Sequence, residues 1–159
     1  MTIKDVRSGR SSIFCNLALF SGWRMMTEQR FEKLAAWRHG VRLVESVYRA
    51  TRRFPNDEKP GLSAVMRRAV AVVPGKIADG VGRCDPDEAL RALEDAFGAM
   101  RELKTHLIVA RRMRFTSAWR LAMVRRRMRF TEQAMIELRE HFERMVDQRP
   151  LSLQLRRAA

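Results

Sequence analysis

Proline, glycine and long apolar runs are all scarce in this chain. Its 159 residues include only five prolines and eight glycines. All-β domains use such residues in their many turns, so their scarcity suits a protein of long helices. No apolar run approaches the ~20 residues that a membrane-spanning helix needs. Since 46% of the residues are hydrophobic and 31% are charged, the composition favours one domain of a few long helices and predicts no membrane span.

Cysteine and histidine are too few and too scattered to indicate a reactive site. Cys15 and Cys84 lack the spacing of a disulfide framework or a zinc site. His39, His106 and His141 fall in three different predicted helices, without an H-E-x-x-H motif or a glycine-rich phosphate loop. The sequence therefore predicts no catalytic residue, no metal and no cofactor, and we expect a protein that is not an enzyme. A reducing cytoplasm is its simplest location.

Acidic residues are also in short supply. The 18 aspartates and glutamates face 32 lysines and arginines, which gives a net charge of +14 and a pI of about 11.4. Such a chain is attracted to polyanions, namely nucleic acid, acidic membrane surfaces or acidic proteins. The alternative is that the charge reflects only an arginine-rich, GC-rich genome.

One stretch has no acidic residue at all. Arginine side chains match phosphate oxygens in a bidentate manner and stack on bases, so we interpret this stretch as a nucleic-acid-binding surface. A solvated helix face is the alternative, although such faces normally mix charges of both signs. The candidate residues are Arg111, Arg112, Arg114, Arg120, Arg125, Arg126, Arg127 and Arg129.

Apolar residues at steps of three and four predict four helices, within a bundle spanning residues 27–147. The first is expected from Thr27 to just before Phe54, the second from Leu62 to a stop at Gly80 and Gly82, the third from an Asp85-Pro86 start, and the fourth over residues 117–146. Residues 1–26 are interpreted as a disordered arm or a wrongly assigned leader, and residues 148–159 as a tail. The stripe expected to be buried in the first helix is Phe31, Leu34, Trp37, Val41, Val44 and Tyr48.

The segment between Phe54 and Gly80 carries the most specific signals. Pro55 disfavours a helical conformation at Phe54 and so ends the first helix. Pro74 lies inside the apolar stripe of the second helix, where it predicts a bend. Gly80, together with Gly82, predicts the end of that helix.

The order of these residues resembles the 23S rRNA-intervening-sequence protein family, with its F-P-x-x-E-x-x-G-L, R-R-A and S-I-P-x-N-I-A-E-G motifs. A further segment from Ala96 to Leu107 resembles the family's A-x-G-S-x-x-E-L-E-T-x-L. The matched positions, which we expect to be structural, are Phe54, Pro55, Glu58, Gly61, Leu62, Arg67, Arg68, Pro74, Ile77, Asp79 (a glutamate in the family), Gly80, Gly98, Glu102 and Thr105.

The resemblance covers about Phe31 to Phe142 and implies an all-α, antiparallel up-down four-helix bundle that assembles as a homopentamer. A related branch serves diversity-generating retroelements as an accessory protein that binds nucleic acid and a reverse transcriptase, so a reverse transcriptase is a further candidate partner. Gly98 is expected to mark a close helix crossing. Glu102 is expected to form a salt bridge, with Arg67 or Arg68 as candidate partners.

Three functions remain open at this stage. The first is a non-enzymatic basic homo-oligomer that holds structured RNA or DNA through arginine–phosphate contacts. The second is a protein-interaction scaffold or retroelement accessory protein whose charge is incidental. The third is a membrane-surface protein that uses an arm from Ile13 to Trp23; it is the least favoured, and we expect no membrane partner.

Overall fold

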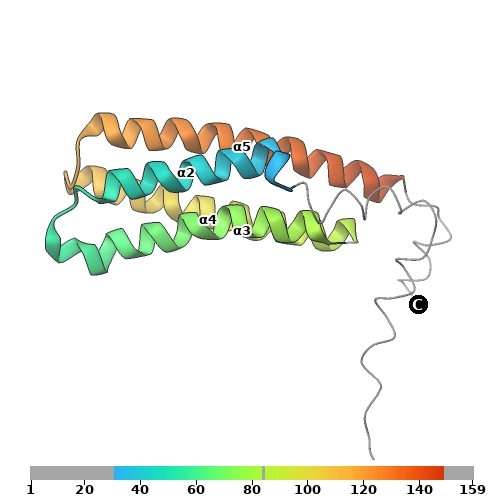
Figure 1. The fold of residues 1–159 in the computed structure, drawn as a ribbon, viewed down its shortest axis with the longest axis horizontal. Coiled ribbons are helices and arrows are strands. Elements are labelled where there is room, and N and C mark those ends of the chain that lie inside the picture. Colours follow the sequence, from blue (N-terminus) through green and yellow to red (C-terminus); the bar gives the residue numbers. More distant parts are fainter. Residues whose placement is uncertain (1–30, 84, 149–159) are drawn as a thin grey trace, which may run out of the picture.

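The structure is a computed structural model that describes residues 31–83 and 85–148. These residues contain four long helices and no strand: α2 (Ala35–Thr51), α3 (Ala64–Gly82), α4 (Pro86–Arg112) and α5 (Ala118–Asp147). Successive helices run in opposite directions along one another (Figure 1). The predicted all-α four-helix fold is therefore confirmed. The first helix was predicted to begin at Thr27, but α2 begins only at Ala35, because Leu34 before it adopts an extended conformation. Thr27, Cys15, Cys84, the predicted arm over residues 1–26 and the predicted tail from residue 149 onward lie outside the described residues.

Each helix packs against two neighbours. α2 lies between α3 and α5, and α4 lies between the same two helices on the other side. The connection from α2 to α3 and that from α4 to α5 therefore meet at one end of the bundle. Phe54 and Phe115, one from each connection, are in ring contact there with their centroids 5.6 Å apart. This end of the bundle carries most of the candidate residues.

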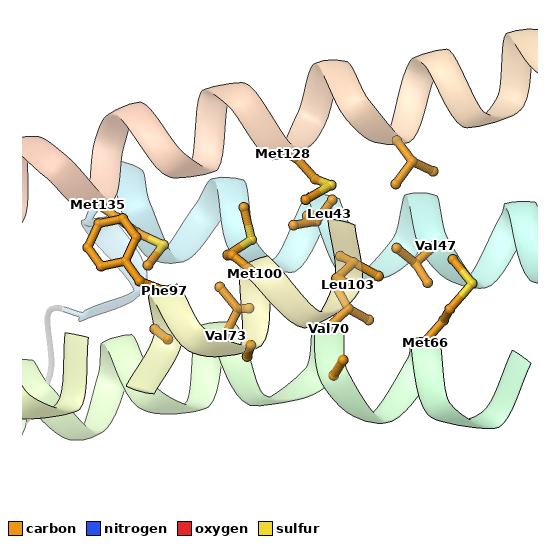
Figure 2. Packing of buried hydrophobic residues seen from close by; sticks show 14 of the residues in the cluster. Leu43, Val47, Met66, Val70, Val73, Phe97, Met100, Leu103, Met128 and Met135 are labelled. Atoms are coloured by element: carbon orange, nitrogen blue, oxygen red, sulfur yellow. The ribbon is translucent and has the colours of Figure 1, made fainter. Parts of the chain in front are cut away.

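The core is a continuous column of aliphatic side chains, methionines and phenylalanines. Figure 2 shows Leu43 and Val47 of α2 facing Val70 and Val73 of α3, with side chains of α4 and α5 closing the column. Along α5, residues at steps of three and four form a stripe that faces the core. Leu121, Val124, Met128, Thr131, Met135 and Phe142 are buried, and Leu138 and Met145 are partly buried. The thioethers fill irregular gaps between the layers of branched side chains.

The predicted start of α4 is also confirmed. Asp85 adopts an extended conformation, and its carboxylate accepts a hydrogen bond from the Asp87 N–H at 3.2 Å. Pro86 occupies the first helical position, where a missing N–H is not needed. Asp87 and Glu88 then place negative charge at the positive end of the helix dipole.

The stripe predicted for the first helix is wrong by one position. The buried side of α2 consists of Ala36, Gly40, Leu43, Val47, Ala50 and Thr51, whereas Tyr48 is 44% exposed and the other five predicted residues are only partly buried. Both sets follow steps of three and four, so periodicity alone did not separate them. Small residues face the core because α2 approaches α3 closely: a Cβ on Gly40 would lie 3.4 Å from the Pro74 Cβ.

The glycines of α3 and α4 bear out one prediction and contradict another. α3 ends at Gly82, in agreement with the stop predicted from Gly80 and Gly82. Gly80 lies at the crossing with α4, where an added Cβ would come within 3.1 Å of the Ala89 carbonyl oxygen. Gly98, expected at a close crossing, has only the Arg101 guanidinium near it, at 3.9 Å from an added Cβ. The close approach between α3 and α4 therefore lies at Gly80 and not at Gly98.

The motif between α2 and α3 forms a compact capping arrangement. The chain passes through two short helical turns, Asn56–Glu58 (η3) and Lys59–Ser63 (η4). The Glu58 carboxylate accepts a hydrogen bond from the Leu62 N–H at 3.3 Å. A Cβ on Gly61 would lie 3.0 Å from that same carboxylate, so the glycine leaves room for it.

None of the described helices is both long and apolar enough to cross a bilayer.

Candidate nucleic-acid interface

The eight candidate arginines gather at one end of the bundle and along the adjoining part of α5. Arg111 and Arg112 form the last turn of α4, Arg114 lies in the connection, and the other five belong to the first half of α5. Six of the eight are exposed, and Arg120 and Arg127 are partly buried. None of the eight forms an ion pair with a carboxylate of the described residues.

Charge is divided unequally along the length of the bundle. We define the basic half as residues 45–72 and 100–131, which lie toward the end with the α2–α3 and α4–α5 connections (Figure 1). It holds sixteen arginines and lysines and four acidic residues. We define the acidic half as residues 31–44, 73–83, 85–99 and 132–148. It holds eight arginines and lysines and twelve acidic residues. The positive charge of the described residues is thus concentrated at one end.

The two halves also differ in how their charges are paired. In the acidic half, Lys76 binds Asp95 at 2.7 Å, and Arg83 binds Asp79 at 3.0 Å and Glu88 at 3.4 Å. Hydrogen bonding to Asp95 raises the pKa of Lys76. Ion pairs described within the basic half are limited to Arg49–Glu45 and His106–Glu102. Most cations of the basic half therefore remain available to an anionic ligand.

The sequence interpretation missed part of this surface. Arg49, Arg52 and Arg53 at the end of α2, with Lys59 in the connection, lie at the same end of the bundle as the candidate arginines. They were overlooked because more than fifty residues separate them from Arg111 in the sequence. The up-down topology was the signal that could have found them, since it brings the first and third connections together.

Arg114 occupies a backbone position that normally belongs to glycine. The Phe115 N–H donates to the Ala110 carbonyl and the Arg114 N–H donates to the Arg111 carbonyl, both at 3.2 Å. These two bonds form a Schellman motif, which requires a left-handed residue at its C′ position. Arg114 supplies it with φ = 56°. An arginine is held here despite a conformational cost of about 1 kcal/mol or more.

Two aromatic side chains interrupt the arginines of α5. Trp119 is 63% exposed and Phe130 is 45% exposed. The Arg120 guanidinium lies 5.1 Å from the Trp119 ring centroid, and the Arg126 guanidinium lies 5.7 Å from that of Phe130. The basic half therefore presents flat apolar rings as well as positive charge.

His39 of α2 packs against this part of α5. Its ring stacks on Phe130 with the centroids 6.0 Å apart. Burial, followed by the charges of Arg42, Arg127 and Arg38, lowers the pKa of His39 from its ordinary value. The lowered pKa favours the neutral imidazole beside these three cations.

Comparison with known proteins decides the family. The profile of the 23S rRNA-intervening sequence protein family matches residues 32–129, well over half of the chain. The chain belongs to this family. No curated protein matches it.

One residue of the family motifs, Arg67, links two of the described helices. The Thr51 hydroxyl, which is fully buried, donates to the Val47 carbonyl at 2.9 Å and accepts a hydrogen bond from Arg67 Nε at 2.9 Å. The Arg67 guanidinium lies 4.9 Å from the Tyr48 ring centroid. Arg67 thus joins α3 to α2, whereas Arg68 is exposed.

The expected partner of Glu102 was wrong. Its carboxylate lies 3.5 Å from His106 Nε2, one turn along α4, rather than against Arg67 or Arg68. Arg67 is already engaged by Thr51 across the α2–α3 contact, which explains why it does not reach Glu102. Thr105, the next motif residue, is exposed, and its hydroxyl donates a hydrogen bond to the Arg101 carbonyl at 3.1 Å.

The described part of this family member contains no group of three or more His, Cys, Asp or Glu side chains able to hold a metal ion. Its carboxylates instead cap helices or pair with cations, as Glu58 and Asp79 do. Hydrogen bonding from Arg83 lowers the pKa of Asp79. The side chains gathered in the basic half can bind an anion, and guanidinium groups have no accessible neutral form to act as a base.

Proposed function

We propose that this protein is a non-enzymatic nucleic-acid-binding bundle whose basic half holds RNA or DNA through arginine–phosphate contacts. The observation that supports this most strongly is the division of charge, with sixteen cations and four acids in one half. Repulsion among the unpaired arginines destabilises the folded state. The phosphate groups of a bound nucleic acid reduce that repulsion.

Assembly and location complete the proposal. The family resemblance favours a homopentamer, which would repeat the basic half in each subunit and raise affinity by avidity. The two scattered cysteines favour a reducing cytoplasm as its location. The contacts are expected to be tolerant of sequence and sensitive to salt, because they release counterions from the phosphate backbone. A reverse transcriptase remains a candidate partner through the retroelement branch.

A protein-interaction scaffold is the second candidate. It is favoured by exposed apolar side chains such as Met113 and Ile108, which are 58% and 51% exposed. Under this hypothesis those side chains would bind a protein, and the basic half would serve only for solubility.

Fluorescence anisotropy of a labelled structured RNA and a labelled DNA duplex, titrated with the full chain over a salt series, tests the first function. Affinity should fall steeply with rising salt, with a slope that counts the phosphates engaged. Replacing Arg111 and Arg112 by glutamine should reduce that slope by about one for each phosphate that the variant no longer binds.

A matched control is available in the acidic half. Arg91 and Arg144 are exposed arginines, and their replacement by glutamine removes the same net charge from the other end of the bundle. The control should change affinity much less than the Arg111 and Arg112 pair. Equal losses from both pairs would show that net charge alone matters, and an absence of binding at low salt would favour the scaffold.

A further inference from the structure

Three large apolar side chains remain on the outside of α5. Trp119, Met123 and Phe130 are 63%, 40% and 45% exposed. They lie at i, i+4 and i+11, and Arg126 occupies i+7, so the four residues share one face of the helix. Phosphate binding by arginine does not require these rings, and folding has not buried them.

Each aromatic ring on this face is accompanied by a guanidinium group. Arg120 lies 5.1 Å from the Trp119 centroid, and Arg126 lies 5.7 Å from the Phe130 centroid, within the range of cation–π attraction. His39 further supports Phe130 through its stacked ring. The rings are thus held by their neighbours and keep about half or more of their surface open to a ligand.

The charges around this face indicate which kind of ligand it binds. From Ala118 to Thr131, α5 carries five arginines and no acidic residue, and Arg42 of α2 adds positive charge beside His39. A purely apolar protein partner would leave these guanidinium groups without anions. The complementary ligand is therefore a polyanion that also offers flat π surfaces.

Single-stranded nucleic acid meets both requirements, whereas a duplex offers mainly phosphates on its outside and keeps its bases stacked on one another. Proteins that bind single strands combine a positive groove with aromatic side chains on which bases stack. We infer that Trp119 and Phe130 are base-stacking platforms, and that the ligand of the basic half is a segment of unpaired nucleotides. The two rings are about 16 Å apart along the helix, so they would receive bases that are not adjacent.

This inference rests on the proposed function but can fail without it. The test compares a labelled 20-nucleotide single strand with the duplex formed from the same strand, using the full chain and its Trp119→Ala and Phe130→Ala variants. Each substitution should weaken single-strand binding by about 5- to 150-fold, the range that loss of one stacked base produces. Duplex binding should change less than twofold, and Trp119→Phe should recover much of the loss.

Ile108→Ala supplies the control. Ile108 is also large, apolar and exposed, but it lies on α4 and has no ring, so its loss should leave both affinities unchanged. A second readout uses Trp23→Phe with Trp37→Phe, which leaves Trp119 as the remaining tryptophan of the three in the chain. Its emission should be quenched by the single strand and not by the duplex.

Three results would overturn the inference. In the first, Trp119→Ala weakens the binding of single strand and duplex equally, or changes the binding of neither. Either outcome would mean that the arginines bind phosphate without base stacking on Trp119. Light scattering could show that Trp119→Ala or Phe130→Ala changes the mass of the assembly, which would assign the face to contact with a second copy of the chain. If the unchanged protein binds neither ligand at low salt, the proposed function fails and the inference with it.

Discussion

Gly80 on α3 lies directly against the backbone of Ala89 on α4. A Cβ at position 80 would be 3.1 Å from the Ala89 carbonyl oxygen and 3.3 Å from the Ala92 Cβ. Because the first of these atoms belongs to helix backbone, it cannot move aside without shifting the helix. We therefore expect Gly80→Ala to lower the free energy of unfolding by about 1–3 kcal/mol.

Gly75, five residues earlier on the same helix, provides the matched control. An added Cβ there meets no atom of the described residues within 4 Å, so Gly75→Ala should raise the free energy of unfolding by up to about 1 kcal/mol. Urea titration of both variants measures the difference. If Gly80→Ala were as stable as Gly75→Ala, the α3–α4 crossing would be looser than described.

The buried hydroxyl of Thr51 should contribute to stability through Arg67. Thr51→Val keeps the shape of the side chain but removes the acceptor of the Arg67 Nε–H and the donor to the Val47 carbonyl. We expect a loss of about 1–2 kcal/mol in the free energy of unfolding. Thr105→Val is the control, because Thr105 is exposed and bonds only within its own helix; it should change stability by less than about 0.5 kcal/mol.

Arg114 should show a conflict between stability and binding. Arg114→Gly relieves the left-handed backbone conformation at φ = 56° and should raise the free energy of unfolding by about 0.5–1 kcal/mol. The same change removes a cation from the basic half and should weaken nucleic-acid binding.

Arg114→Gln separates the two effects, because it retains the backbone strain and loses only the charge. It should weaken binding as much as Arg114→Gly while leaving stability close to that of the unchanged protein. Unaltered affinity in both variants would remove Arg114 from the interface.

His39 should make the stability of the bundle depend on pH. Its pKa in the folded state is below 6.5, because of burial and then the charges of Arg42, Arg127 and Arg38. The unfolded chain therefore binds a proton more readily than the folded protein does, and stability falls as the pH drops below about 6.5 toward the lower folded pKa. Urea midpoints at pH 7.5 and pH 5.5 measure this decrease.

The chain contains two other histidines, so the His39→Gln variant is needed to isolate the contribution of His39. The variant should lose less stability than the unchanged protein between the two pH values. An identical decrease in both proteins would assign the pH dependence to other groups.

Helix positions were largely predictable because local signals agree with one another. Asp85 and Pro86 fix the start of α4, as expected. α5 begins at Ala118, one residue after the predicted start, because Ser117 is extended. The seam from Leu121 to Phe142 is buried because only one apolar stripe of α5 runs its whole length. The first helix was less predictable, since two stripes of equal periodicity compete and the close approach of Gly40 to Pro74 selects the one with smaller residues.

The candidate interface was predictable only in part. The arginines from Arg111 to Arg129 stand out because no acid separates them. Arg53 and Lys59 were not included, because their position at the same end of the bundle as Arg114 depends on two helix connections meeting there. Trp119 and Phe130 lie beside the buried stripe of α5, and their exposure and their arginine neighbours are properties of packing.

By itself, the sequence determined the helices, their main caps, the family and the excess of arginine, because propensity, capping and composition act over a few residues. The tertiary structure decided which stripe of α2 is buried, which glycine permits a helix crossing, which partners Arg67 and Glu102 take, and that the charge lies in one half. These outcomes depend on distances between residues far apart in the chain. Only the packing of four antiparallel helices sets those distances.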